Sequence, residues 1–92
     1  MAATGYVCIV NEAGPTTLHS DTPIPEILIR LSDTNGSFTN AFFFAAGSAK
    51  NQMLAVALAA ISTQSRVSAW VDPPNNGNTP WTQCYELRVL AS

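Results

Sequence analysis

Stretches with the hydrophobic pattern of β-strands occur five times along the chain, and one longer stretch has the composition of a helix. Runs that are β-branched and aromatic, or that alternate apolar with polar residues, favour strands. Between the third and fourth such runs, Ala49–Gln64 contains no proline or glycine and is dominated by Ala, Leu and Met. The predicted strands are Gly5–Val10, Glu26–Leu31, Ser37–Ala45, Arg66–Val71 and Thr82–Leu90.

Alternation is clearest in the second and the last of these stretches. In the second, the two sets are Ile27, Ile29 and Leu31 against Glu26, Leu28 and Arg30. In the last, they are Cys84, Glu86 and Arg88 against Tyr85, Leu87 and Val89. A period of two residues puts each set on its own face of a sheet.

The predicted helix is built around nine consecutive apolar residues, Met53–Ile61. Its composition gives high helix propensity. Ser48 is the expected N-cap, and Gly47 before it leaves the backbone free to turn into the helix.

Apolar residues surround this helix on all sides. A core-facing stripe with the spacing i, i+4, i+7 is predicted for Leu54, Leu58 and Ile61. Ala55 and Ala59 fall on the opposite side, and residues 51–65 contain no ionisable side chain. A helix that is apolar all round is covered on more than one side. We therefore interpret the helix as part of the core and, through the Ala55 and Ala59 side, as a subunit interface.

The order of elements is strand, strand, strand, helix, strand, strand. A helix between the third and fourth of five strands is the chain order of the OB-fold, a small Greek-key barrel. We therefore predict a mainly β fold with one helix that plugs an end of the barrel. Residues 1–92 are expected to form one domain, because a chain this short buries one modest core. An open five-stranded sheet with one helix is the alternative.

Proline, glycine and asparagine mark the connections. Asn11–Pro25 and Asp72–Pro80 are predicted loops, and Asp33–Gly36 is a predicted tight turn, since Asn and Gly tolerate positive φ. His19 and Asp21 lie in the first loop, where spacing places no nucleophile or second base near them. We interpret His19 as a solvated loop histidine.

The third predicted strand carries the four phenylalanines Phe38, Phe42, Phe43 and Phe44. Three consecutive aromatic residues put rings on both faces of a sheet. We expect the rings to pack in the core and in an interface. A stacking platform for bases or sugars is the alternative use.

Charged residues are scarce, at 11% of the chain against about 25% in typical soluble domains. The shortage suggests that an assembly covers part of the surface. A net charge of −2 and four scattered cations argue against nucleic acid, because phosphate binding needs clustered Lys and Arg. The apolar run is shorter than the about 20 residues that span a bilayer, so no membrane insertion is expected.

The start of the sequence has neither a positive n-region nor a hydrophobic h-region, so it predicts no signal peptide. Localisation stays open: the protein is secreted if a signal peptide has been removed, and otherwise cytoplasmic.

Candidate chemistry is sparse. The sequence has one histidine, six carboxylates without a close pair, no glycine-rich phosphate loop and no metal-ligand spacing. We expect no catalytic residues, no metal and no cofactor, and hence a binding or assembly module rather than an enzyme. Cys8 and Cys84 lie in predicted strands and form either a disulfide or two buried free thiols.

One long stretch resembles the B subunits of subtilase-cytotoxin-type and pertussis-like bacterial toxins. It runs from Thr4-Gly5-Tyr6-Val7 through Gln52-Met53-Leu54-Ala55-Val56-Ala57-Leu58-Ala59-Ala60 to Val67-Ser68-Ala69-Trp70-Val71-Asp72-Pro73. The resemblance covers most of the chain. It implies an OB-fold subunit in a homo-pentamer whose helices line the central axis. It also implies a cell-surface glycan as ligand and an enzymatic A subunit as a possible partner.

The resemblance further implies a set of ligand-binding residues. Thr4 matches a serine that helps those subunits hold sialic acid. The aromatic residue that they carry at the end of the fourth strand aligns with Val71, and the ring here lies one residue earlier, at Trp70. Trp81 and Tyr85, beside the long loop, are independent candidates for sugar contact.

The sequence thus predicts a non-enzymatic homo-pentameric ring that binds a carbohydrate or a protein. A single-stranded nucleic-acid module that stacks bases on the phenylalanines is one alternative. A purely structural ring component is the other.

Overall fold

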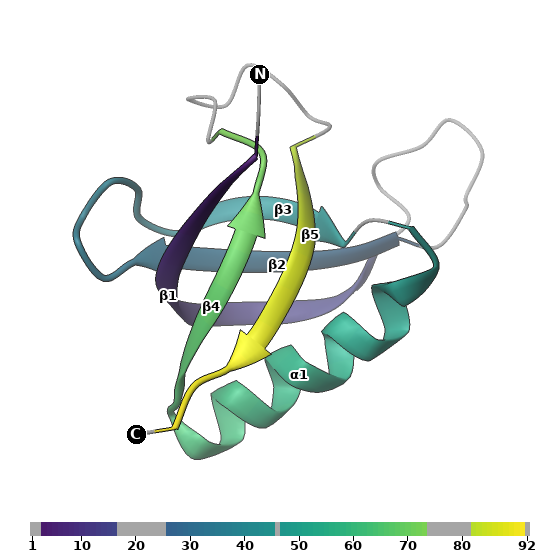
Figure 1. The fold of residues 1–92 in the computed structure, drawn as a ribbon. Helices are drawn as coiled ribbons and strands as arrows, with labels where there is room; N and C mark the ends of the chain where they lie inside the picture. Colours follow the sequence, from purple (N-terminus) through teal and green to yellow (C-terminus); the bar gives the residue numbers. More distant parts are fainter. Residues whose placement is uncertain (1–2, 17–25, 46, 74–81, 92) are drawn as a thin grey trace.

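A computed structural model describes residues 3–16, 26–45, 47–73 and 82–91. Its elements follow the predicted order and are drawn in Figure 1. They are β1 (Thr4–Thr16), β2 (Glu26–Asp33), β3 (Ala41–Ala45), a 3-10 turn (Gly47–Ala49), α1 (Lys50–Thr63), β4 (Arg66–Val71) and β5 (Gln83–Val89).

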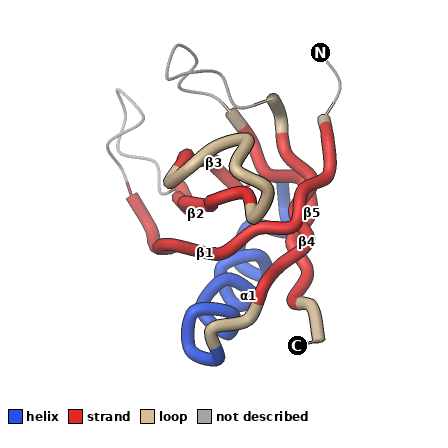
Figure 2. The backbone as a smooth tube through the Cα atoms, turned by 90° about the vertical axis from the view of Figure 1, so that its left-hand side faces the viewer, coloured by secondary structure: helices blue, strands red, loops and turns tan. Residues whose placement is uncertain are grey.

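The five strands form a closed barrel in the order β1-β2-β3-β5-β4. The long, curved β1 pairs through its first half with β4 and through its second half with β2. A short parallel contact between β3 and β5, with Phe44 opposite Gln83 and Ala45 opposite Cys84, completes the circle. Helix α1 lies across one end of the barrel (Figures 1 and 2). This confirms the predicted OB-like barrel and excludes the open sheet.

The predicted loop Asn11–Pro25 is wrong over its first six residues, because β1 continues to Thr16. Gly14 and Pro15 sit opposite Leu28 and Ile27 in an antiparallel ladder with β2. Pairing with β4 ends at Ile9, so this half of β1 has a strand partner on one side only. Proline, which lacks an N–H donor, is accepted at such an edge. Residues 17–25, with His19 and Asp21, lie outside the described part.

Strand β2 has the predicted period of two. Ile27, Ile29 and Leu31 are buried, and the residues between them are half-buried. The turn after β2 is also confirmed: the N–H of Gly36 donates to the carbonyl of Asp33 at 3.0 Å, and Gly36 has a φ of 87°. Strand β3 begins only at Ala41, not at Ser37.

Strict alternation along the last strand is wrong. Cys84 and Leu87 both face the interior, although they are three residues apart. The register with β4 shifts between Trp70 and Val71, which pair with Glu86 and Cys84. Such a β-bulge adds one residue to the strand. It turns Tyr85 outward beside Glu86.

The predicted core stripe of α1 is wrong for Leu58 and Ile61, whereas Leu54 is half-buried and packs against the core. The buried residues of α1 are Met53, Ala57 and Ala60, while Leu58 is 47% and Ile61 38% exposed. Both sets have the spacing i, i+4, i+7, so a helix that is apolar all round gives no signal to choose between them. Small side chains at positions 57 and 60 allow the helix backbone to approach the strands closely.

The ends of α1 also differ in part from expectation. Ser48 lies in the 3-10 turn, and the N-cap position belongs to Ala49, without a side-chain hydrogen bond. At the other end, Gln64 adopts a left-handed conformation, and its N–H closes the last turn on Ile61. The αL residue at a helix end satisfies carbonyls that would otherwise lack a donor.

Phenylalanine rings lie on both faces of β3, as predicted. Phe43 points inward and meets Phe38 edge-to-face at 5.6 Å, and Phe38 meets Tyr6 at 5.0 Å. Phe42 lies on the other face and contacts Phe44 at 6.0 Å. Phe38, Phe43 and Phe44 are buried, so three of the four rings are not open to stacking.

Ala57→Leu should destabilise the fold by about 1–3 kcal/mol, because added methyl groups overpack a closed contact. Ala57 is fully buried against the barrel. Gln52→Leu is the control: it places the same side chain at an exposed position of α1 outside the core, and a change within about 0.5 kcal/mol is expected there. Urea unfolding of both variants checks the difference. Equal losses would mean that α1 is turned differently on the barrel.

The carboxylate of Asp33 should make stability depend on pH. Hydrogen bonds from Ser37, followed by one from the backbone of Asn35, lower its pKa. The unfolded chain therefore takes up this proton first, so the contribution is complete above roughly pH 4 and is lost as pH falls through the folded-state pKa. Asp33→Asn should flatten the acid decline in urea unfolding midpoints. Parallel declines in both proteins would contradict this assignment.

Candidate functional site

Three of the four predicted ligand-binding residues meet at one end of the barrel, where β1 and β5 begin and β4 ends (Figure 1). Thr4 pairs with Val71, the neighbour of Trp70, and Tyr85 lies near the start of β5. Trp70 and Tyr85 are 49% and 45% exposed. Trp81 lies outside the described residues. We call Trp70, Tyr85 and Asp72 the aromatic platform.

The indole of Trp70 lies against the backbone of Gly5, its partner across the ladder. A Cβ on Gly5 would come within 2.7 Å of Cε3 of Trp70, so glycine is what permits the contact. Val71 is fully buried and points into the barrel. The ring at position 70 therefore faces outward, and the position that aligns with the toxin aromatic residue is part of the core.

Tyr85 is fixed by a carboxylate that the sequence analysis did not single out. Its hydroxyl donates to Oδ1 of Asp72 at 2.8 Å, and Oδ2 of Asp72 accepts the backbone N–H of Gln83 at 3.0 Å. The hydrogen bond to Asp72 is the main cause that raises the pKa of Tyr85. No sequence signal predicts this pair, because it depends on the bulge in β5.

One end of the barrel thus carries an exposed indole, and a phenol and a carboxylate that hold each other in a fixed orientation. An apolar ring face beside a few oriented polar groups is the usual make-up of a site for a small polar ligand. Thr4 is exposed at the same end of the barrel, but it pairs with buried Val71, so its side chain lies on the opposite face of the sheet from Trp70.

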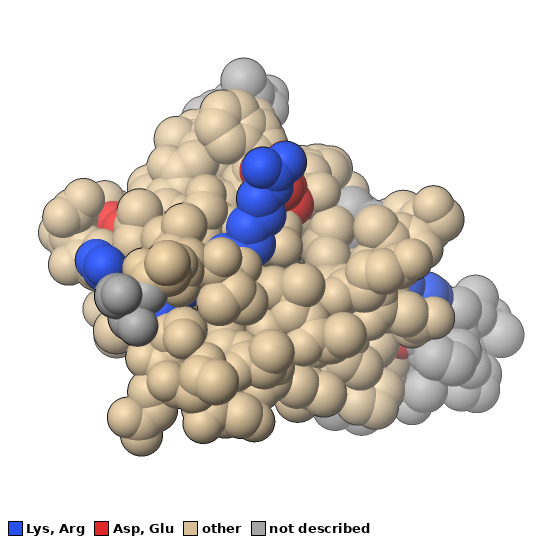
Figure 3. Space-filling view, turned by 60° about the horizontal axis from the view of Figure 1, so that its bottom comes forward, with Lys and Arg blue, Asp and Glu red and all other residues tan. Residues whose placement is uncertain are grey.

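Two exposed apolar patches lie elsewhere on the surface. The helix patch consists of Ala55, Leu58, Ala59 and Ile61 on the outer side of α1. Figure 3 shows a continuous area without charged side chains on the face of the molecule that carries α1. The strand patch consists of Val7 and Ile9, which are 37% and 50% exposed on the outer side of β1.

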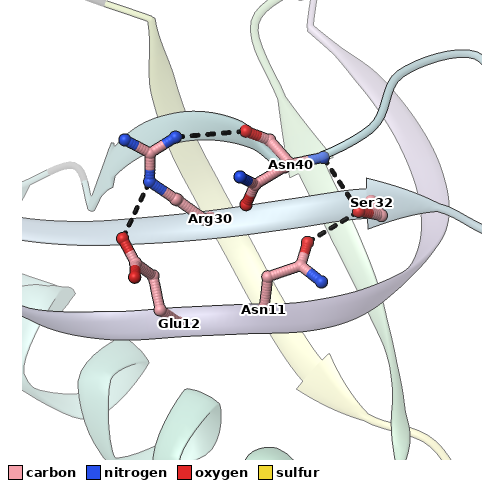
Figure 4. A network of polar contacts seen from close by, with 5 residues as sticks. All are labelled: Asn11, Glu12, Arg30, Ser32 and Asn40. Atoms are coloured by element: carbon pink, nitrogen blue, oxygen red, sulfur yellow. Dashed lines mark hydrogen bonds and ion pairs between the residues drawn. The ribbon is translucent and has the colours of Figure 1, made fainter.

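A polar network covers the outer side of β1 and β2 (Figure 4). Nε of Arg30 donates to Glu12 at 2.8 Å, and a second Arg30 nitrogen donates to the carbonyl of Asn40 at 3.2 Å. Ser32 donates to Asn11 at 2.6 Å and accepts the backbone N–H of Asn40 at 2.8 Å. From the sequence, Arg30 is expected only as part of an alternating strand. The ladder that brings Glu12 opposite it was missed, because residues 11–16 were expected to form a loop.

Cys8 and Cys84 are fully buried and carry no disulfide, so they are free thiols. Burial raises the pKa of Cys8 to about 12 and that of Cys84 to about 11. Almost no thiolate is then present at neutral pH, and thiolate is the reactive form. In the described part of the chain, no three His, Cys, Asp or Glu side chains are grouped to hold a metal ion. Within the same residues, no helix has the length and apolar content needed to cross a bilayer.

Gly5→Ala should displace the indole of Trp70, because the new methyl group would lie inside van der Waals contact. Tryptophan emission should shift to longer wavelength, measured in a Trp81→Phe background so that Trp70 alone reports. A loss of about 0.5–1.5 kcal/mol is expected if the side chain is forced off its rotamer. Gly14→Ala is the control, since a Cβ there meets nothing within 4 Å. An unchanged emission maximum in Gly5→Ala would contradict the described packing.

Comparisons with protein-family models, with curated proteins and with solved structures give no match for this chain. The function is therefore argued from the geometry of the barrel surface.

Proposed function

We propose that the protein is a non-enzymatic binding module that assembles into a homo-oligomeric ring. The observation that carries the proposal is the helix patch. Leu58 and Ile61 are 47% and 38% exposed, and no charged side chain occurs between Lys50 and Arg66. Exposed apolar area of this kind marks interaction sites. A second copy of the chain is the occupant, since it offers a matching uncharged surface.

A ring is favoured over a two-fold dimer because the apolar patches are different from each other. A two-fold interface pairs one patch with itself, whereas a ring joins two different patches of neighbouring copies. The helix patch lies on α1 at the end of the barrel, and the strand patch lies on the wall formed by β1. The resemblance to toxin B subunits suggests five copies, with α1 turned toward the axis.

The ligand proposed for the ring is a carbohydrate, held at the aromatic platform. Trp70 offers a ring face, and Tyr85 and Asp72 offer a hydroxyl and a carboxylate in fixed positions. Buried sugar hydroxyls need partners of this kind, because an unpaired one is costly. A ring without any small ligand is the competing outcome.

Leu58→Asp should convert the ring to monomers, because a buried unpaired charge in the contact is costly. Native mass spectrometry and light scattering check the mass, and circular dichroism should remain that of the wild type, since Leu58 lies outside the core. Gln52→Asp is the control: it adds the same charge to an exposed position in the first turn, where negative charge is tolerated. A wild-type protein that is monomeric at every protein concentration tested would contradict the proposal.

A further inference from the structure

We infer that Asn35 is a site of spontaneous covalent modification, where the side-chain amide is lost through a cyclic imide, and that the folded turn after β2 protects it. Asn35 precedes Gly36, and both are exposed in the connection between β2 and β3, which projects from the barrel (Figure 1). A backbone nitrogen attacks most easily where its own residue has no side chain to hinder the approach. Such a modification limits the lifetime of the native chain and is independent of the proposed function.

The reaction needs only water as a second reactant. The backbone nitrogen of Gly36 attacks Cγ of Asn35, so a new C–N bond forms and the bond from Cγ to the side-chain nitrogen breaks. Ammonia leaves and carries away the proton of the Gly36 N–H. Water then opens the cyclic imide at either of its carbonyls. The product is aspartate or isoaspartate, and in isoaspartate the backbone runs through the side-chain carbons and is longer.

The attacking nitrogen is held in the folded turn. The N–H of Gly36 donates to the carbonyl of Asp33 at 3.0 Å. Gly36 has a φ of 87°, a conformation that other residues rarely adopt. Imide formation requires the Gly36 nitrogen to lose its proton and to turn toward Cγ of Asn35. The hydrogen bond opposes both steps, so the turn has to open before the reaction proceeds.

One carboxylate keeps the turn closed. Oδ1 of Asp33 accepts the backbone N–H of Asn35 at 3.2 Å, and Oδ2 accepts the backbone N–H of Ser37 at 3.0 Å. Asp33 is only 7% exposed, so water competes little for these contacts. Hydrogen bonds to a charged acceptor are stronger than those between neutral groups. Asp33 therefore fixes the residue before Gly36 and the residue after it.

The ends of the turn are anchored to the barrel. The N–H of Asp33 donates to the carbonyl of Phe38 at 3.0 Å, and Phe38 is buried in the core. The N–H and the hydroxyl of Thr34 both donate to the carbonyl of Val7 at 3.0 Å. Proteins open locally where few buried contacts hold a segment. Opening can therefore be confined to residues 35–37 while the barrel stays folded.

Either product disturbs the turn in which it forms. A new carboxylate at position 35 lies beside that of Asp33, and like charges repel each other. Isoaspartate also lengthens the backbone between the two N–H groups that Asp33 binds, so their spacing no longer fits its carboxylate. Closure of the turn is then weaker, and the change is irreversible without a repair enzyme.

Peptide mapping by mass spectrometry tests the inference on the full chain incubated at neutral pH. Replacement of NH2 by OH raises the mass of the peptide that contains Asn35, and chromatography separates isoaspartate from aspartate. Conversion should be at least about tenfold slower in the folded protein than in guanidinium chloride, because only the opened turn reacts. Mapping reads Asn35 separately from a second Asn-Gly pair, Asn76-Gly77, which lies outside the described residues. No conversion of Asn35 in the unfolded chain would overturn the site, and equal rates in both states would overturn its protection.

Two variants separate opening of the turn from global unfolding. Asp33→Asn keeps one acceptor oxygen in place of two, so the N–H of Asn35 or of Ser37 loses its partner. Conversion at Asn35 in the folded variant should then be roughly tenfold faster than in the wild type. Ala57→Leu is the control, because it weakens the packing of α1 far from the turn, and its rate should stay that of the wild type. Equal acceleration in both variants, or none in Asp33→Asn, would overturn the role of Asp33.

Discussion

The filled interior of the barrel limits how closely α1 can pack against it. This limit determines which apolar residues of α1 are buried and which are exposed. Eight strands make a barrel just wide enough for side chains to fill it, so a barrel of five is narrower still. Its core already holds Phe43, Leu31 and Ile29. The helix that closes the end buries Met53 at its start and then the small Ala57 and Ala60, while Leu58 and Ile61 remain on the outer side. An exposed apolar face is the direct consequence of close helix packing.

A second constraint comes from β1, which belongs to two ladders. Its first half carries Gly5, Val7 and Ile9 beside β4, and its second half carries Glu12 and Gly14 beside β2. The outer wall of the barrel is thereby divided into an apolar and aromatic side and a polar side. The register irregularity between Val10 and Glu12 falls at the boundary between the two.

The sequence predicts most of the fold, because alternation and composition are local signals. The period of two alone puts Ile27, Ile29 and Leu31 on one face, and that face is the interior of the barrel. The errors occur where pairing between strands far apart in the sequence determines the local structure. Pro15 has the composition of a loop residue, and it fits a strand only because this half of β1 has a strand partner, β2, on one side alone. The bulge at Tyr85 is defined only by the pairing of β5 with β4. The Tyr85–Asp72 and Arg30–Glu12 pairs join residues 13 and 18 positions apart, so no local pattern contains them.

The proposed assembly would strengthen the proposed binding of a small ligand. A site for a single sugar is weak by itself, because few atoms make contact. Copies joined in a ring hold several such sites at fixed separation, and linked binding raises the effective affinity by roughly 10²–10⁴-fold when the geometry fits. Using the helix and strand patches for assembly leaves the polar side of β1 and β2 facing solvent. Under the proposal, the uncharged surface serves contacts between copies, and the oriented Tyr85–Asp72 pair is left for the ligand.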